Sequence, residues 1–264
     1  MSGLGLPVAE RPEELGLSAE RLERIRRTLR RDVERRLIPG AVMLIARGGR
    51  VGFAEAVGYR DREAGSAMTT DAIFRIASMT KPIVSVAALM LAEEGELQLS
   101  APVAEYLPEF KEPTVGTERV RARRAMSVQD LLRHTSGLTY AAFGDTPVQM
   151  LWRQADLMNL EQTNADLVAK LAQLPLLFEP GTTWEYSMST DVLGRVVEVA
   201  SGLSLADFLA RRITGPLGMA DSGFAAPGER AARLAEPQTD AASGLRPPMR
   251  DVARPHLWAS GGGG

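Results

Sequence analysis

The sequence predicts an α+β fold in which one helix and one β-hairpin precede a long, mainly helical stretch. Apolar residues recur at helical spacing over residues 18–37, and two β-rich runs follow, joined by Gly48 and Gly49. The later apolar runs have the length of helices. With 264 residues, 45% hydrophobic and 24% charged, the chain is typical of a globular protein with a sizeable core, in one large domain or two small ones.

We expect residues 1–70 to hold the N-terminal helix and hairpin of an α/β domain. Ser18 can cap the helix, and residues 41–46 and 51–58 are the two strands, because Gly-Gly between apolar runs is typical of a hairpin turn. A lone hairpin is not stable and its open edges need further strands, but none is evident after residue 60. We therefore expect the missing strands beyond Gly264, in a longer polypeptide, or in a second chain that completes the sheet.

Residues 71–224 are expected to be mainly helical. The first helix contains the apolar run 83–92, with Ser78 in its first turn and Gly95 at its end. A capping-box pattern at Ser127 begins a short helix that ends near His134. Further helices are expected at 146–160, 164–173, 191–200 and 204–213. Residues 225–264 are rich in Pro, Gly, Ala and Arg, and we expect them to form a loop-rich segment that leads into an absent C-terminal part.

Ser78 and Lys81 are the first candidates for chemistry. They are three residues apart, so on a helix their side chains share one face, and the helix N-terminus favours a negatively charged nucleophile. A lysine one turn on can take the serine proton if its surroundings make the amine neutral. The chain has only three lysines among 31 basic residues, and this is its single Ser-x-x-Lys pair. From these residues alone, a serine cap with a solvated lysine is an equally open interpretation.

Tyr186 is the second candidate. It lies in the stretch Trp184–Met188, which follows a Pro-Gly turn and precedes a predicted helix. A tyrosine held near a lysine ammonium has a lowered pKa and can relay protons. The alternative is a tyrosine whose ring packs at an interface and whose hydroxyl finds a local partner.

Several motifs, taken together, resemble those of the serine β-lactamase-like hydrolases related to class C β-lactamases. Within that group the chain is most similar to the family VIII carboxylesterases, and the resemblance covers the chain from about residue 18. The motifs occur in this order: Ser78–Pro82, Leu131–Leu138, Pro180-Gly181, Trp184–Ser187, Asp191–Gly194 and Pro216–Met219.

The resemblance implies a β-lactamase/transpeptidase-like fold, in which an antiparallel sheet flanked by helices is joined to a mainly helical domain. It implies that Ser78 is the nucleophile, Lys81 the general base and Tyr186 a proton relay. It also places the backbone N–H of Ser78 in the oxyanion hole. In this family the C-terminal strands carry a third motif, which should follow Gly262 and is absent from this sequence.

The resemblance favours a serine carboxylesterase that cleaves short-chain esters through an acyl-enzyme on Ser78. Met188 stands where class C β-lactamases carry the asparagine of Tyr-x-Asn, and methionine cannot hold a lactam amide in the same way. Met188 and Trp184 are the candidate substrate-binding residues. Two alternatives stay open. One is a β-lactamase or D,D-peptidase acting on lactams or D-Ala-D-Ala peptides, and the other is a non-catalytic protein that keeps the fold.

Composition narrows the other classes of function. The chain has no cysteine and two histidines, so we expect no metal and no cofactor. A net charge of −2 predicts neither nucleic acid nor membrane as a partner, which leaves a small-molecule ester. The N-terminus shows no basic segment followed by an apolar one, so we expect a cytoplasmic protein. No Gly-x-Ser-x-Gly elbow occurs, and His134 is interpreted as a structural residue at a helix end.

Overall fold

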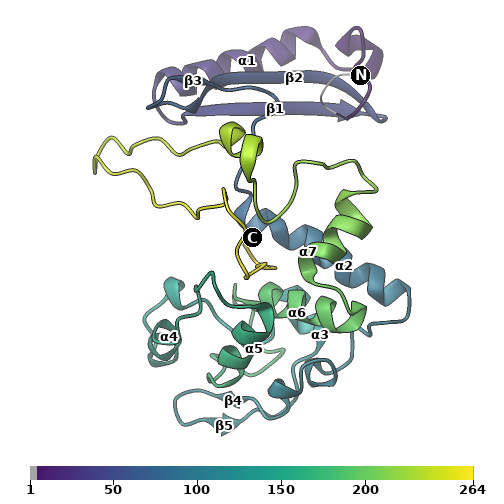
Figure 1. The fold of residues 1–264 in the computed structure, drawn as a ribbon, viewed down its shortest axis with the longest axis vertical. Helices are drawn as coiled ribbons and strands as arrows, with labels where there is room; N and C mark the ends of the chain where they lie inside the picture. The colour runs from purple at the N-terminus through teal and green to yellow at the C-terminus, as the bar shows by residue number, and fades with distance from the viewer. Residues whose placement is uncertain (1–4, 264) are drawn as a thin grey trace. The chain divides into compact units, whose positions relative to one another are not determined.

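A computed structural model of the chain describes residues 5–263 (Figure 1). Its internal contacts divide the chain into two compact units. The first combines the described residues up to Arg75 with Ala225–Pro255, and the second combines Ile76–Phe224 with the described residues from His256 onward. The predicted loop-rich segment 225–264 is thus divided between the two units.

The first unit is built on a three-stranded antiparallel sheet and one long helix. The helix α1 spans Ala19–Glu34, and Ser18 caps it by accepting a hydrogen bond from the backbone N–H of Arg21. The strands β1 (Gly40–Arg47) and β2 (Arg50–Asp61) pair antiparallel as the predicted hairpin. Figure 1 shows α1 lying along this sheet, where its residues Leu22 and Val33 are buried.

A third strand corrects one expectation. β3, Ser66–Ala67, pairs with β2 on the edge that β1 leaves open, so the absence of any strand after residue 60 is wrong. Two residues are too few to show the alternation of apolar and polar positions that indicates a strand. The pairing is instead set by the turn at Gly65, whose φ of +67° favours glycine.

The returning segment 225–255 contributes loops to the first unit. It contains a short 3₁₀ helix, η7 (Gly228–Arg233), and a single β-bridge between Leu234 and Ile73. The guanidinium of Arg75 fastens this segment, because it donates hydrogen bonds to the carbonyls of Ala235 and Arg250. The described part of this segment holds no strand.

The second unit is mainly helical. Its core lies between α2 (Thr80–Glu93) and α6 (Ser189–Ser201), with Val84, Ala87 and Leu91 of α2 buried in the same cluster as Val192, Leu193 and Val196 of α6. None of the helices in the described residues is both long and apolar enough to cross a membrane. The other α-helices are α3 (Val128–Arg133), α4 (Pro147–Arg153), α5 (Asn164–Ala172) and α7 (Leu205–Leu209), the last continued by a π-helical turn, η6 (Ala210–Thr214).

Short elements complete the two units. One two-stranded ribbon joins β4 (Thr114–Val115) and β5 (Val120–Arg121). The single-turn 3₁₀ helices are η1 (Pro12–Leu15), η2 (Ala77–Met79), η3 (Val103–Glu105), η4 (Pro108–Phe110) and η5 (Ala141–Phe143).

Two helix boundaries differ from those predicted. The expected helix 146–160 ends at Arg153, and the chain reverses at Asp156, whose φ is +48°. Ser78 lies in the single turn η2, and α2 begins two residues later at Thr80. Gly95 follows the last turn of α2 with a φ of +81°, the left-handed conformation in which glycine commonly ends a helix.

Candidate active site

Ser78 and Lys81 occupy consecutive turns at the N-terminal end of α2. Ser78 is exposed in η2, and Lys81 is half-buried as the second residue of α2. Ala77, directly before Ser78, has a φ of +44°, which is unfavourable for a residue with a Cβ atom. Backbone strain of this kind persists where the surrounding structure fixes it, and it is common next to reacting groups.

The three residues predicted to act together are in mutual contact. The hydroxyl oxygens of Ser78 and Tyr186 are 2.5 Å apart, within hydrogen-bond distance. The ammonium of Lys81 donates to the Tyr186 hydroxyl at 2.8 Å and to the Ser78 hydroxyl at 3.2 Å. A serine hydroxyl and two groups that could take its proton therefore share one hydrogen-bonded triangle, the arrangement that proton transfer from serine requires.

The surroundings of Tyr186 favour ionisation of its phenol. Burial opposes the charged form, but hydrogen bonds from Lys81 and Ser78 and the charge of Lys81 outweigh it. The pKa of Tyr186 therefore lies below its ordinary value. The Tyr186 hydroxyl lies closer to the Ser78 oxygen than the Lys81 ammonium does. Its phenol also loses a proton more readily than that of an ordinary tyrosine.

Lys81 has a third acceptor that the sequence did not predict. Its ammonium donates to the carbonyl oxygen of Gly262 at 2.5 Å. The carboxylate of Asp191, in the first turn of α6, holds this glycine by accepting from the Gly262 N–H at 3.0 Å and from the Ser260 hydroxyl at 2.5 Å. A Cβ atom on Gly262 would collide with that carboxylate, so this position requires glycine.

Asp191 is the charged residue that sequence reasoning missed. It is fully buried, and burial raises its pKa despite the donors that surround it. The tyrosine hydroxyl of Tyr140 also donates to it, at 3.4 Å. The available signal was a carboxylate directly before the apolar residues Val192 and Leu193 of a predicted core helix, because a buried acid needs partners that a packed helix does not supply.

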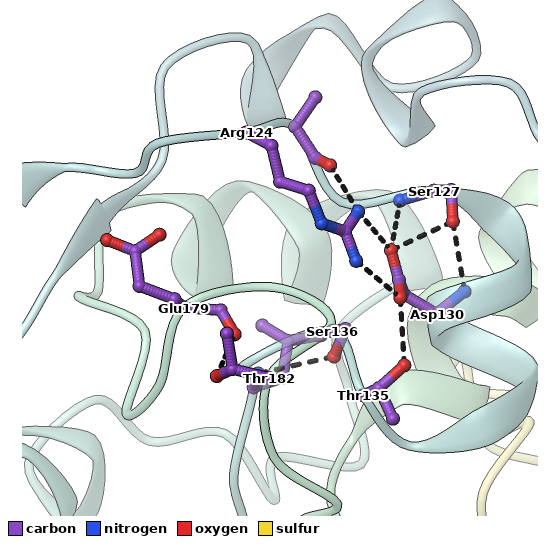
Figure 2. A network of polar contacts seen from close by, with 9 residues as sticks. Arg124, Ser127, Asp130, Thr135, Ser136, Glu179 and Thr182 are labelled. Carbon is purple, nitrogen blue, oxygen red and sulfur yellow. Dashed lines mark hydrogen bonds and ion pairs between the residues drawn. The ribbon is translucent and has the colours of Figure 1, made fainter.

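A second buried carboxylate, Asp130 of α3, is the centre of a network of polar contacts (Figure 2). Asp130 accepts two hydrogen bonds from the guanidinium of Arg124, two from Ser127 and one from the hydroxyl of Thr135. Burial alone would raise the pKa of this carboxyl, but these donors lower it to about 2. The turn that begins at His134, at the end of α3, is thereby fixed to the start of the same helix.

Aromatic rings surround the Tyr186 side chain. The ring centroids of His134, Tyr140 and Phe143 lie 5.0, 5.3 and 6.0 Å from that of Tyr186, and the Trp184 ring stacks on it at 6.4 Å. Trp184 is 66% exposed, which suits the substrate contact predicted for it.

Met188 is placed differently. It is 2% exposed and belongs to the hydrophobic core, so a direct contact with substrate, which the sequence predicted, is at odds with this burial. Its backbone precedes α6, and its side chain points into the packing between helices. The sequence motif gave its distance from Tyr186 along the chain but not the direction of its side chain.

The sequence profile of the beta-lactamase family matches residues 25–264. The chain is 44% identical over 194 residues to Esterase EstB from Burkholderia gladioli, an alignment that covers 72% of this chain and 48% of EstB. The chain therefore spans about half the length of this curated relative.

Two solved structures share the fold. EstCE1, described as a hydrolase with promiscuous acyltransferase activity, superposes with a TM-score of 0.81 at 30% identity, over 92% of this chain and 68% of that one. Simvastatin synthase (LovD) from Aspergillus terreus superposes with a TM-score of 0.73 at 28% identity, over 94% and 65% of the two chains. The fold is thus the β-lactamase/transpeptidase-like arrangement of antiparallel strands and helices.

Proposed function

The chain belongs to the beta-lactamase family, and from this premise we propose that it is a serine hydrolase that cleaves short-chain carboxylic esters through an acyl-enzyme on Ser78. The observation that carries the proposal is the hydrogen-bonded triangle of Ser78, Lys81 and Tyr186. The similarity to an esterase supports the choice of substrate class.

In the first half of the reaction, the Ser78 oxygen attacks the ester carbonyl carbon while its proton passes to the Tyr186–Lys81 pair. The pair can accept this proton when it is short of one, either as phenolate with ammonium or as phenol with neutral amine, because the hydrogen bond between the two groups lets a proton pass from one to the other. The backbone N–H of Ser78 would stabilise the oxyanion that forms. The pair then returns the proton to the leaving alcohol oxygen as the carbon–oxygen bond breaks.

In the second half, water attacks the acyl carbonyl and gives its proton to the same pair. The bond between the acyl carbon and the Ser78 oxygen breaks, and the serine recovers its proton from the pair, which releases the carboxylic acid. Each group thus ends in the state in which it began. Lys81 is held in place for both halves by its bond to the Gly262 carbonyl.

A second candidate function is acyl transfer to an alcohol. The acyl-enzyme is the same, and an alcohol takes the place of water in the second half of the reaction. The observation that favours it is the likeness to EstCE1, which is described as having promiscuous acyltransferase activity, and to the synthase LovD. Which acceptor prevails depends on how well the site binds an alcohol beside the acyl group.

Assays on matched substrates separate these functions. Wild-type protein and Ser78→Ala are compared on p-nitrophenyl butyrate, on nitrocefin, and on p-nitrophenyl butyrate with an added alcohol. The proposal expects ester hydrolysis that depends on Ser78 and exceeds any hydrolysis of nitrocefin. Faster turnover of nitrocefin would indicate a β-lactamase, accumulation of the new ester would indicate transfer, and no turnover at all would support a non-catalytic protein.

A further inference from the structure

We propose that His134 is a positioning residue that holds Tyr186 against Ser78 and Lys81. This inference rests on the proposed function, because it assigns a role within the same site. The sequence interpretation gave His134 a structural role at a helix end, where a cation or a local hydrogen bond is favourable. The contacts of His134 instead converge on the residues next to Tyr186.

His134 binds the backbone on both sides of Tyr186. Its carbonyl oxygen accepts from the N–H of Glu185 at 2.9 Å, and its ring nitrogen Nδ1 accepts from the N–H of Ser187 at 3.3 Å. The imidazole ring also packs against the Tyr186 ring, with centroids 5.0 Å apart. One residue thus fixes the two peptide groups that set the direction of the Tyr186 side chain.

The geometry explains why a histidine suits this position. His134 ends α3 in the left-handed conformation, with a φ of +57°, which histidine and asparagine tolerate better than most residues. Because Nδ1 accepts from a backbone N–H, the ring must be neutral and carry its proton on Nε2. Burial, helped by the charge of Lys81, lowers the pKa of His134 to about 4, so the ring is neutral at neutral pH.

The support for His134 is itself rigid. Asp130 binds the hydroxyl of Thr135, and the Thr135 carbonyl accepts from the N–H of Gly181 at 2.7 Å, which anchors the start of the segment that carries Tyr186. On the other side, the Ser187 hydroxyl contacts that of Ser189 at 2.7 Å. The segment from 181 to 187 is therefore tied at its beginning, next to the tyrosine and at its end.

The first test compares substitutions that keep or remove the acceptor. His134→Gly relieves the positive φ but removes the ring, whereas His134→Asn keeps a side-chain oxygen that can accept from a nearby backbone N–H. Arg36→Gly is the matched control, because Arg36 has a φ of +58° and lies in the other unit. We expect His134→Gly to lower kcat on p-nitrophenyl butyrate by roughly 10- to 100-fold with little change in KM, His134→Asn to recover part of the loss, and Arg36→Gly to match wild type.

The pH profile separates positioning from general damage. If Tyr186 moves away from Lys81, it loses the contacts that lower its pKa, and the pH at which kcat reaches half its plateau moves upward. A lower kcat with an unchanged profile, in a variant that melts as wild type does, would overturn the proposal. Wild-type protein without esterase activity would instead defeat the proposed function.

A second measurement leaves His134 in place. The chain has two histidines, so the ¹⁵N resonances of the imidazoles in wild-type protein can be assigned with His256→Gln. The proposal expects the Nδ1 of His134 to be unprotonated at pH 7, with the proton on Nε2. Nδ1 also lies 3.3 Å from the Ser187 hydroxyl oxygen. A proton on Nδ1 would exclude the bond from the Ser187 N–H, leave only that hydroxyl as a partner, and overturn the proposed hold on the backbone next to Tyr186.

Discussion

Asp130→Asn should destabilise the second unit by an amount that the structure allows us to work out. Asp130 is 5% exposed, and its five hydrogen bonds hold the pKa of its carboxyl at about 2, against 3.8 for a free aspartate (Figure 2). A pKa difference of this size corresponds to about 2 kcal/mol of folding free energy at neutral pH. Asparagine keeps the shape but loses the charge that Arg124 binds, and Arg124 is half exposed, so water can take over its remaining hydrogen bonds.

The pH dependence follows from the direction of the shift. Because the folded pKa lies below the unfolded one, the stabilisation is complete above about pH 4 and is lost as the pH falls from there towards 2. We therefore expect Asp130→Asn to lower the free energy of unfolding by about 2 kcal/mol at pH 7. The corresponding fall in melting temperature is roughly 4–8 °C for a unit of this size. The difference in the free energy of unfolding between Asp130→Asn and wild-type protein should become small as the pH approaches 2.

A matched control isolates the contribution of Arg124 and Thr135. Asp166 forms the same capping box at the start of α5, where it accepts from the backbone and hydroxyl of Thr163, but it lies on the surface. Urea unfolding of Asp130→Asn and Asp166→Asn, followed by tryptophan fluorescence, should show a clearly smaller loss for Asp166→Asn. Two results would refute the reasoning. One is an equal loss of unfolding free energy in the two variants at pH 7, and the other is a difference between Asp130→Asn and wild-type protein that stays constant down to pH 2.

Two further predictions concern the groups around the nucleophile. Lys81→Arg should be nearly as inactive as Lys81→Ala, because arginine cannot lose its proton. The planar guanidinium also cannot meet the three acceptors that the Lys81 ammonium reaches. Substantial ester hydrolysis by the arginine variant would show that the lysine supplies charge alone. Asp191→Ala should lower kcat more than roughly tenfold with little change in KM, because Ser260 and Gly262 lose the acceptor that holds the Gly262 carbonyl against Lys81. Asp207→Ala, which removes an exposed carboxylate, is the control. A kcat for Asp191→Ala equal to that of the wild-type protein would show that the buried Asp191 carboxylate has no part in positioning the site.

Local signals predicted much of the fold. The cap at Ser18, the Gly-Gly turn and the capping box at Ser127 each act within a few residues of the chain, and each is found where the sequence placed it. β3 escaped prediction because its two residues are specified by pairing with β2 and not by their own pattern. The boundary of α2 was missed because the turn before it, Ala77–Met79, is a 3₁₀ turn, which a sequence pattern does not distinguish from the first turn of an α-helix.

The site was predictable only where its residues lie close together in the sequence. The spacing of Ser78 and Lys81 indicates a shared helix face, but the approach of Tyr186 came from the family resemblance, since 105 residues separate it from Lys81. Asp191 and Gly262 lie 71 residues apart, and only the tertiary fold brings them together beside Lys81. His134 was undervalued because its partners lie in a segment more than 50 residues away.

The most direct measurement is covalent trapping of the acyl-enzyme. Wild-type protein and Ser78→Ala are mixed briefly with p-nitrophenyl butyrate, quenched in acid and analysed by intact mass and peptide mapping. The proposal predicts that one butyryl group is added to wild-type protein, on the peptide that contains Ser78 and on that residue, and that Ser78→Ala is neither labelled nor active. Butyryl label on another residue, or hydrolysis by Ser78→Ala at the wild-type rate, would contradict the proposed role of Ser78.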